Sequence, residues 1–241
     1  ANLFESNNSD SFKTFVRDLT DELHNELGFE VKKDEELEIK EVRDTINKLR
    51  AKNLDDDSFI KKFSDIFKEN KMESISEGTF FSSILFISAL DETNKIETFL
   101  EKFENAESPQ MQGRYRAVLG QVRDQNASKK IVEFMLDGRI RGADCPYILA
   151  SMITNKYIGK KSWKVIKENF NDLLSVMPDW TASRILDALP AIYDEEFAGD
   201  IKNFIKKNPL PSSEKLAAQK LERLEANIEF MDNLKEVNNE T

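Results

Sequence analysis

The chain contains one histidine and one cysteine, His24 and Cys145, the side chain types best suited to hold zinc or to form a nucleophile–base pair. A zinc site of the His-Glu-x-x-His type needs two imidazoles, which this chain cannot supply. We therefore predict no catalytic residue and no metal site. We expect His24 on a solvated helix face, and Cys145 half-buried at a helix start that Pro146 favours.

A basic stretch in the second half of the chain is the other feature that could do chemistry. Between Arg139 and Lys167 the sequence has seven basic side chains and one acidic one, Asp144, whereas the whole chain has 35 basic and 45 acidic residues and a net charge of −10. One interpretation is a solvated helix face. The other is a basic lining that receives an acidic partner or a terminal carboxylate. The residues alone leave both open.

Composition and patterning exclude several function classes. A net charge of −10 argues against nucleic acid as a partner, because phosphates attract a basic face. No apolar run approaches the roughly 18 residues that span a membrane. The first residues also lack the basic and then apolar pattern of a signal peptide. Because a single unpaired cysteine is typical of a reducing compartment, we expect a cytoplasmic location.

The elements that must position these residues are helices, because apolar side chains recur with a period of 3.6 along the chain and no segment shows strict alternation. The segment 80–87 is apolar on most sides, which places it in the middle of a core. Helices number about a dozen with short links, too many for one bundle, so we predict an all-α, irregular superhelix, a HEAT- or armadillo-like solenoid. The expected stripes are 12–27, 39–49, 59–67, 80–87, 96–103, 111–122, 131–135, 147–152, 163–177, 180–189, 197–205 and 217–231.

Four segments carry a resemblance to a known family. They are 15–30, ending in Glu26-Leu-Gly-Phe-Glu30, then Gly138–Leu149, Ser162–Phe170, and Asn208–Ser212 followed by Ala226–Met231. In this order and spacing they resemble the C-terminal part of zinc aminopeptidases of the aminopeptidase N and tricorn-interacting type. The chain departs from the family pattern at Gly142-Ala143, where the family has a polar pair, and at Phe170, where it has tryptophan.

The resemblance implies that residues 1–241 form a C-terminal helical domain, an irregular superhelix that lacks its first helices. In the family this domain caps the peptide cavity over a catalytic domain, which carries the zinc. The chain itself is then not an enzyme and holds no cofactor, while its parent would remove N-terminal residues from peptides. The implied partners are the catalytic domain of the same polypeptide and peptide substrates. A dimer through the N-terminal end near Phe4, Phe12 and Phe15 is also expected.

The resemblance also gives the basic stretch a role. A peptide held at its amino terminus by a distant zinc must place its carboxylate against the helical domain, and guanidinium groups bind carboxylates through two parallel hydrogen bonds. We expect Arg141 and then Arg184 to bind substrate, with Asp144 orienting Arg141 or capping the helix begun at Pro146. The alternative from another class is a free-standing α-solenoid scaffold that binds a protein partner.

Overall fold

A computed structural model describes residues 9–32, 34–54, 56–69, 78–211 and 213–239. Helices account for 76% of the chain, against roughly a third in a typical globular domain, and the described ranges contain no strand. The predicted all-α fold is confirmed. The chain divides into two compact units, whose described parts are 9–124 and 125–239, and each is described by itself.

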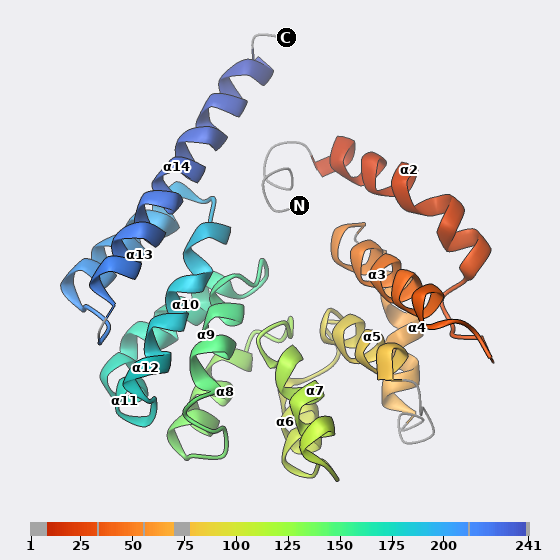
Figure 1. The fold of residues 1–241 in the computed structure, drawn as a ribbon, viewed down its shortest axis with the longest axis horizontal. Coiled ribbons are helices and arrows are strands. Elements are labelled where there is room, and N and C mark those ends of the chain that lie inside the picture. The colour runs from red at the N-terminus through yellow and green to blue at the C-terminus, as the bar shows by residue number, and fades with distance from the viewer. Residues whose placement is uncertain (1–8, 33, 55, 70–77, 212, 240–241) are drawn as a thin grey trace. The chain divides into compact units, whose positions relative to one another are not determined.

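The described residues form thirteen α-helices and one 3₁₀-helix, labelled in Figure 1 where there is room. Unit 9–124 contains α2 (Ser9–Leu27), α3 (Leu37–Asn53), α4 (Asp57–Lys68), α5 (Gly78–Ala89), α6 (Ile96–Glu104) and α7 (Pro109–Leu119). Unit 125–239 contains α8 (Ala127–Leu136), α9 (Cys145–Ile153), α10 (Gly159–Glu168), α11 (Phe170–Val176), α12 (Asp179–Ala182), η2 (Ser183–Ala191), α13 (Glu195–Lys207) and α14 (Glu214–Asn239).

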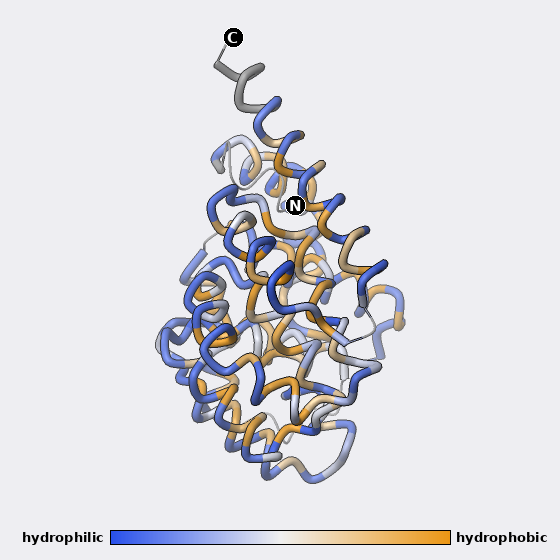
Figure 2. The backbone as a smooth tube through the Cα atoms, turned by 90° about the vertical axis from the view of Figure 1, so that its left-hand side faces the viewer, coloured by the Kyte–Doolittle hydropathy of each residue, from blue (hydrophilic) through white to orange (hydrophobic). Residues whose placement is uncertain are grey.

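The core of unit 9–124 is built around α5, as its sequence predicts. Most of its side chains are buried, and it packs against α3, α4 and α7. Aromatic side chains from both sides fill the core; Phe67 of α4, for example, stacks on Phe99 of α6 with ring centroids 4.8 Å apart. Along the other helices, hydrophobic and hydrophilic residues alternate with the turns (Figure 2). Within this unit most packed helices are close neighbours in sequence, which is solenoid-like packing.

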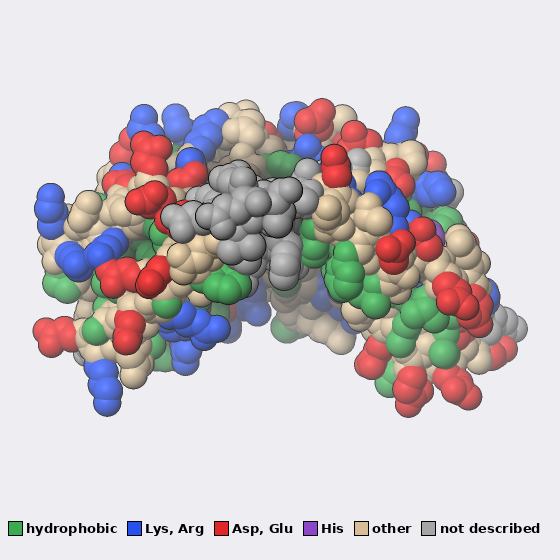
Figure 3. Space-filling model, turned by 90° about the horizontal axis from the view of Figure 1, so that it is seen from above, with side chains coloured by type: hydrophobic (Ala, Val, Ile, Leu, Met, Phe, Trp, Pro, Cys, Tyr) green, Lys and Arg blue, Asp and Glu red, His purple; other side chains and the backbone are tan. Residues whose placement is uncertain are grey.

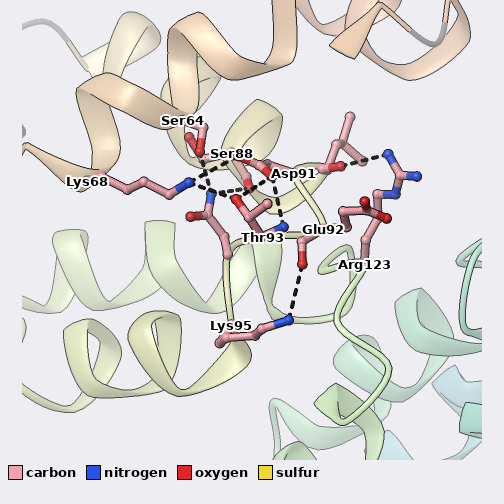
Figure 4. A network of polar contacts seen from close by, with 10 residues as sticks. Ser64, Lys68, Ser88, Asp91, Glu92, Thr93, Lys95 and Arg123 are labelled. Atoms are coloured by element: carbon pink, nitrogen blue, oxygen red, sulfur yellow. Dashed lines mark hydrogen bonds and ion pairs between the residues drawn. The ribbon is translucent and has the colours of Figure 1, made fainter. Parts of the chain in front are cut away.

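A polar network fixes the link between α5 and α6 (Figure 4). Asp91 accepts hydrogen bonds from the backbone nitrogen of Thr93 at 2.9 Å and from its hydroxyl at 2.7 Å. The Nζ of Lys68, on α4, lies 3.3 Å from the same carboxylate. The buried Asn94 donates to the Oγ of Ser64, also on α4, at 2.8 Å. The network therefore ties the link to α4.

In unit 125–239 the buried α9 packs against α10 and η2, and η2 packs against α14. The largest side chain of this core is Trp163 of α10, whose ring meets Phe204 of α13 edge to face at 5.2 Å. Its indole nitrogen donates to Asp200 at 2.9 Å, so the polar edge of the buried ring is also satisfied.

Three details differ from the sequence prediction. The stripe 163–177 is two helices, because the backbone of Asn169 leaves helical geometry, while both its backbone nitrogen and its side chain donate to the Val165 carbonyl. The segment 183–191 is a 3₁₀-helix containing Pro190, which has no N–H to donate to an α-helical bond. The sequence predicts Ser212 or Ser213 as the N-cap of the last helix. Ser213 precedes α14, but its hydroxyl donates back to the Leu210 carbonyl at 2.8 Å. Ser212 lies outside the described residues, as does the polar link 71–78, predicted as a loop, except for Gly78.

The predicted apolar surface at the start of the chain is confirmed in part. Phe15, Leu19 and Leu23 are exposed along one side of α2, while Val16 and Thr20 face its buried side. Phe12 is partly buried, and Phe4 lies outside the described residues. Dimerisation through this end stays a prediction.

Candidate functional site

Arg141 and Asp144 lie in the turn between α8 and α9. The Nε of Arg141 donates to Asp144 at 2.9 Å and its Nη2 donates to the second carboxylate oxygen at 3.4 Å. The Arg141 side chain remains 76% exposed, whereas that of Asp144 is 15% exposed. Asp144 occupies the position before α9 but makes no side-chain cap to it. Of its two expected contacts, Asp144 therefore makes the one that orients Arg141.

The turn that carries Arg141 is held rigidly from behind. A Cβ atom on Gly142 would lie 1.9 Å from the carbonyl oxygen of Val176 and 3.4 Å from Cδ of Pro178, so only glycine allows this close approach. The Cys145 thiol donates to the Arg141 carbonyl at 3.5 Å. The departure from the family pattern at Gly142 therefore has a packing reason.

Arg184 lies near the start of η2 and is held more loosely. Its nearest carboxylate, Asp187, is 3.7 Å away, and the Arg184 side chain is 53% exposed. Asp187 also pairs with Lys220 of α14 at 2.8 Å. No described contact joins Arg184 to Arg141. The two residues belong to neighbouring segments, because the Gly142 turn lies against the link that leads into α12 and η2.

Two exposed aromatic residues on the same segments were missed by the sequence analysis. Trp180 of α12, which the sequence places in an apolar stripe, is 75% exposed, and Tyr147 in the first turn of α9 is 53% exposed. Trp180 immediately precedes the segment carrying Arg184, and Tyr147 follows Asp144 by three residues. Helical spacing alone could not identify them, since an apolar residue in a stripe is ordinarily buried.

Three of the other six basic residues of the stretch pair with carboxylates from outside it. Lys160 pairs with Asp194 at 2.7 Å and Lys167 pairs with Asp200 at 2.6 Å, both carboxylates belonging to the α13 region. Arg139 pairs with Asp137 at 2.7 Å. Acidic and basic side chains are also interspersed over the side of the molecule that is seen from above in Figure 3. The excess of basic residues in the sequence is thus not a uniformly positive surface.

Neither His24 nor Cys145 lies in a described group of side chains that could bind a metal ion together. His24 is half-buried and packs edge to face on Phe59 at 5.4 Å, so it does not lie on the solvated helix face that was expected, and burial together with the charge of Arg50 lowers its pKa. Cys145 begins α9 as expected but is fully buried, and burial raises the pKa of its thiol to about 12. Within the described ranges no three His, Cys, Asp or Glu side chains are grouped as a metal site. The residues present do not fit zinc.

Comparison with known protein families identifies the chain. Among the helices that the structure describes, none is long and apolar enough to cross a membrane. The family model described as "ERAP1-like C-terminal domain" matches residues 1–226. The match covers all four segments of the resemblance except the last residues of the fourth. The chain therefore belongs to the ERAP1-like C-terminal domain family, the C-terminal domain of the M1 aminopeptidases.

Proposed function

We propose that this domain lines the peptide cavity of a cytoplasmic zinc aminopeptidase and contacts the part of the peptide distant from the cleaved bond. The observation that carries the proposal is the exposed, preoriented guanidinium of Arg141 in a member of this family. The zinc and the bond-breaking chemistry belong to the catalytic domain of the parent polypeptide. The present chain contributes to peptide binding and to the selection of peptides by length, because it contacts the end of the peptide that lies far from the cleaved bond.

The geometry of Arg141 supports this role. Asp144 bonds to Nε and Nη2, which leaves the Nη1 edge without a described bond and pointing away from that carboxylate. The rigid turn lowers the entropy that a ligand would otherwise lose in ordering the side chain. Arg184 and Trp180 follow on the adjacent segment and offer a second cation and a large aromatic face. A peptide carboxylate and its neighbouring side chain suit such a combination.

The test is to replace Arg141 and Arg184 by alanine in the full-length parent. Dipeptide amides and peptides of about ten residues are compared as substrates, because only the longer ones can reach from the catalytic zinc to this domain. We expect kcat/KM for long peptides to fall about tenfold or more for Arg141→Ala, the effect of one lost charge-assisted contact. Short substrates should be unaffected.

Lys161→Ala is the matched control, because this exposed lysine of α10 changes the net charge equally. It should leave both substrate classes unchanged. Kinetics of the Arg141 variant that equal those of the wild type on both long and short peptides would contradict the proposal and would leave Arg141 on a solvated surface. An equal loss of kcat/KM for long and short substrates would indicate a damaged fold, which a melting curve of the same variant checks.

A further inference from the structure

A hollow of about 380 Å³ lies between α13 and α14 in unit 125–239. The two helices follow each other in the chain after a short link and lie side by side (Figure 1). In the part of the chain that the structure describes, every residue that lines the hollow belongs to one of these two helices, so no third helix covers it. We call it the α13–α14 groove. Its volume is within the range of known binding sites.

The groove uses a face of α13 that the core does not need. Its α13 lining recurs every three or four positions, from Glu195 to Lys202, as one face of a helix does. On another face of α13, Phe204 meets the Trp163 ring of α10 at 5.2 Å, and Asp200 accepts a hydrogen bond from the indole nitrogen. The α13 helix is thus anchored in the core independently of the groove.

The bottom of the groove is aliphatic and has spare room. Ala198 and Leu224 are buried there, and Ile228 is half-buried beside them. A Cβ atom on Gly199 would meet no atom within 4 Å, so no close packing requires glycine at this helical position. Glycine in a helix interior is otherwise unfavourable compared with alanine. The space beside Gly199 is therefore available to an apolar side chain of another molecule.

Carboxylates surround this aliphatic bottom. The lining includes four of them, on Glu195, Glu225, Glu229 and Asp232, and one cation, Lys202, which gives a formal charge of −3. Lys202 is already hydrogen-bonded to Glu225. Within the described ranges, the exposed Glu195 and Glu229 make no ion pair. A ligand with cations on both sides of an apolar stripe would match this arrangement of charge.

A helix is the element that presents such a pattern. An amphipathic helix can place apolar side chains into the groove between two helices through positions i, i+3, i+4 and i+7, and its flanking positions then lie beside the carboxylates. A second copy of this chain fits less well, because a two-fold contact would bring the same carboxylates against each other. Anionic lipid would be repelled for the same reason.

We propose that the α13–α14 groove docks a basic, amphipathic helical segment of a partner protein. Leucine-like side chains of that segment occupy the space beside Gly199, and its lysine or arginine side chains pair with Glu195 and Glu229. The inference does not depend on the proposed function, because it concerns a protein partner, other residues and the opposite sign of charge.

Binding is tested on the 241-residue chain by fluorescence anisotropy. The probe is a rhodamine-labelled peptide of about 18 residues, five helical turns, with one stripe of leucines flanked by four lysines. A matched peptide has glutamine for each lysine, and a scrambled peptide keeps the composition but disperses the stripe. Because an exposed ion pair contributes about two- to fivefold in affinity, we expect the lysine peptide to bind at least about tenfold more tightly than the glutamine peptide. Its affinity should fall as salt is raised.

Charge variants locate the site through changes of opposite sign. Glu195→Gln combined with Glu229→Gln should weaken binding of the lysine peptide about tenfold, whereas Lys202→Gln, which releases Glu225, should strengthen it about two- to fivefold. The matched control combines Glu196→Gln with Glu222→Gln, one exposed carboxylate from each helix outside the groove. It changes the net charge equally and should bind the peptide like the wild type.

A volume variant tests the same place without changing any charge. Gly199→Phe fills the hollow and should weaken binding about tenfold or more, whereas Gly199→Ala adds little volume and should bind like the wild type. Neither replacement meets close packing in the chain, so both proteins should fold, which a melting curve checks.

Four results would overturn the assignment. Equal affinity for the lysine and glutamine peptides would exclude recognition of charge. Equal affinity for the scrambled peptide would indicate general attraction of a cation to an acidic chain. Unchanged binding in both the double glutamate variant and Gly199→Phe would place the peptide elsewhere. A dimer of the unliganded chain in sedimentation equilibrium that Gly199→Phe dissociates would assign the groove to a second copy.

Discussion

Replacing Asp91 by asparagine removes the negative charge at the centre of the network between α4 and the α5–α6 link. Burial raises the pKa of Asp91, but hydrogen bonds from Ser64 and Thr93 and the charge of Lys68 lower it more, to about 2 from 3.8. Counted in full, at about 1.4 kcal/mol per pH unit, this difference corresponds to about 2.5 kcal/mol. Because Lys68 is 45% exposed and solvent screens its charge, we expect a stabilisation of about 1–2 kcal/mol.

The sign of the pH dependence follows from the lowered pKa. The stabilisation is fully present above the unfolded value of 3.8 and is lost as the pH falls toward the folded value of about 2. Urea unfolding of the wild type and Asp91→Asn, followed by circular dichroism, should give a free-energy difference of about 1–2 kcal/mol at pH 7. That difference should shrink progressively between about pH 4 and pH 2.

The free energy of unfolding of the variant is subtracted from that of the wild type at each pH. This difference cancels the contribution of the many other carboxylates, which titrate in both proteins. Asp65→Asn is the control, because this exposed carboxylate lies on α4, like Lys68, but has no described hydrogen bond or ion pair. Its effect should be small at every pH. A difference between the wild type and Asp91→Asn that stays constant from pH 7 to pH 2 would refute the assignment of the stabilisation to the charge of Asp91.

Two further predictions concern glycines and the thiol. Gly142→Ala should destabilise the protein by about 2–3 kcal/mol, because its Cβ would overlap the Val176 carbonyl. Gly113→Ala should stabilise it by up to about 1 kcal/mol, because its Cβ meets no atom within 4 Å. Thermal melts that rank the two variants in the opposite order would contradict the close approach of Gly142 to Val176. Cys145 should react slowly with a thiol reagent at pH 8 in the native protein and fully in urea, since it is buried with a pKa of about 12; rapid stoichiometric labelling of native protein would disprove its burial.

The helices were predictable from sequence because each has an apolar stripe long enough to define its period. The burial of most side chains of α5 followed from the same pattern, since a helix that is apolar on most sides belongs in the middle of a core. The break at Asn169 was not predictable, because the stripe 163–177 continues through it and the spacing of apolar residues does not reveal the change in backbone geometry at this one residue. The exposure of Trp180 depends on which elements pack against α12, and the spacing of apolar residues in the sequence does not reveal this.

The site residues show the same limit. The pairing of Arg141 with Asp144 could be anticipated, because the two residues are three positions apart just before a helix start. The carboxylates that neutralise Lys160 and Lys167 are more than 30 residues further along the chain, so a local count of charges could not reveal them. Lys48 of α3 likewise lines the same hollow as Arg114 and Arg116 of α7, although more than 60 residues separate them along the chain. Only the packing of α5 between its neighbours brings these cations together.

The packing of helices on close sequence neighbours has a consequence for how the chain folds. Contacts that are local in sequence close short loops, and proteins dominated by such contacts fold fast for their size. Each unit has its own buried core, so folding can begin in either unit and spread helix by helix. The residues of 9–124 leave the ribosome first and can complete the core around α5 while α8 to α14 are still being synthesised.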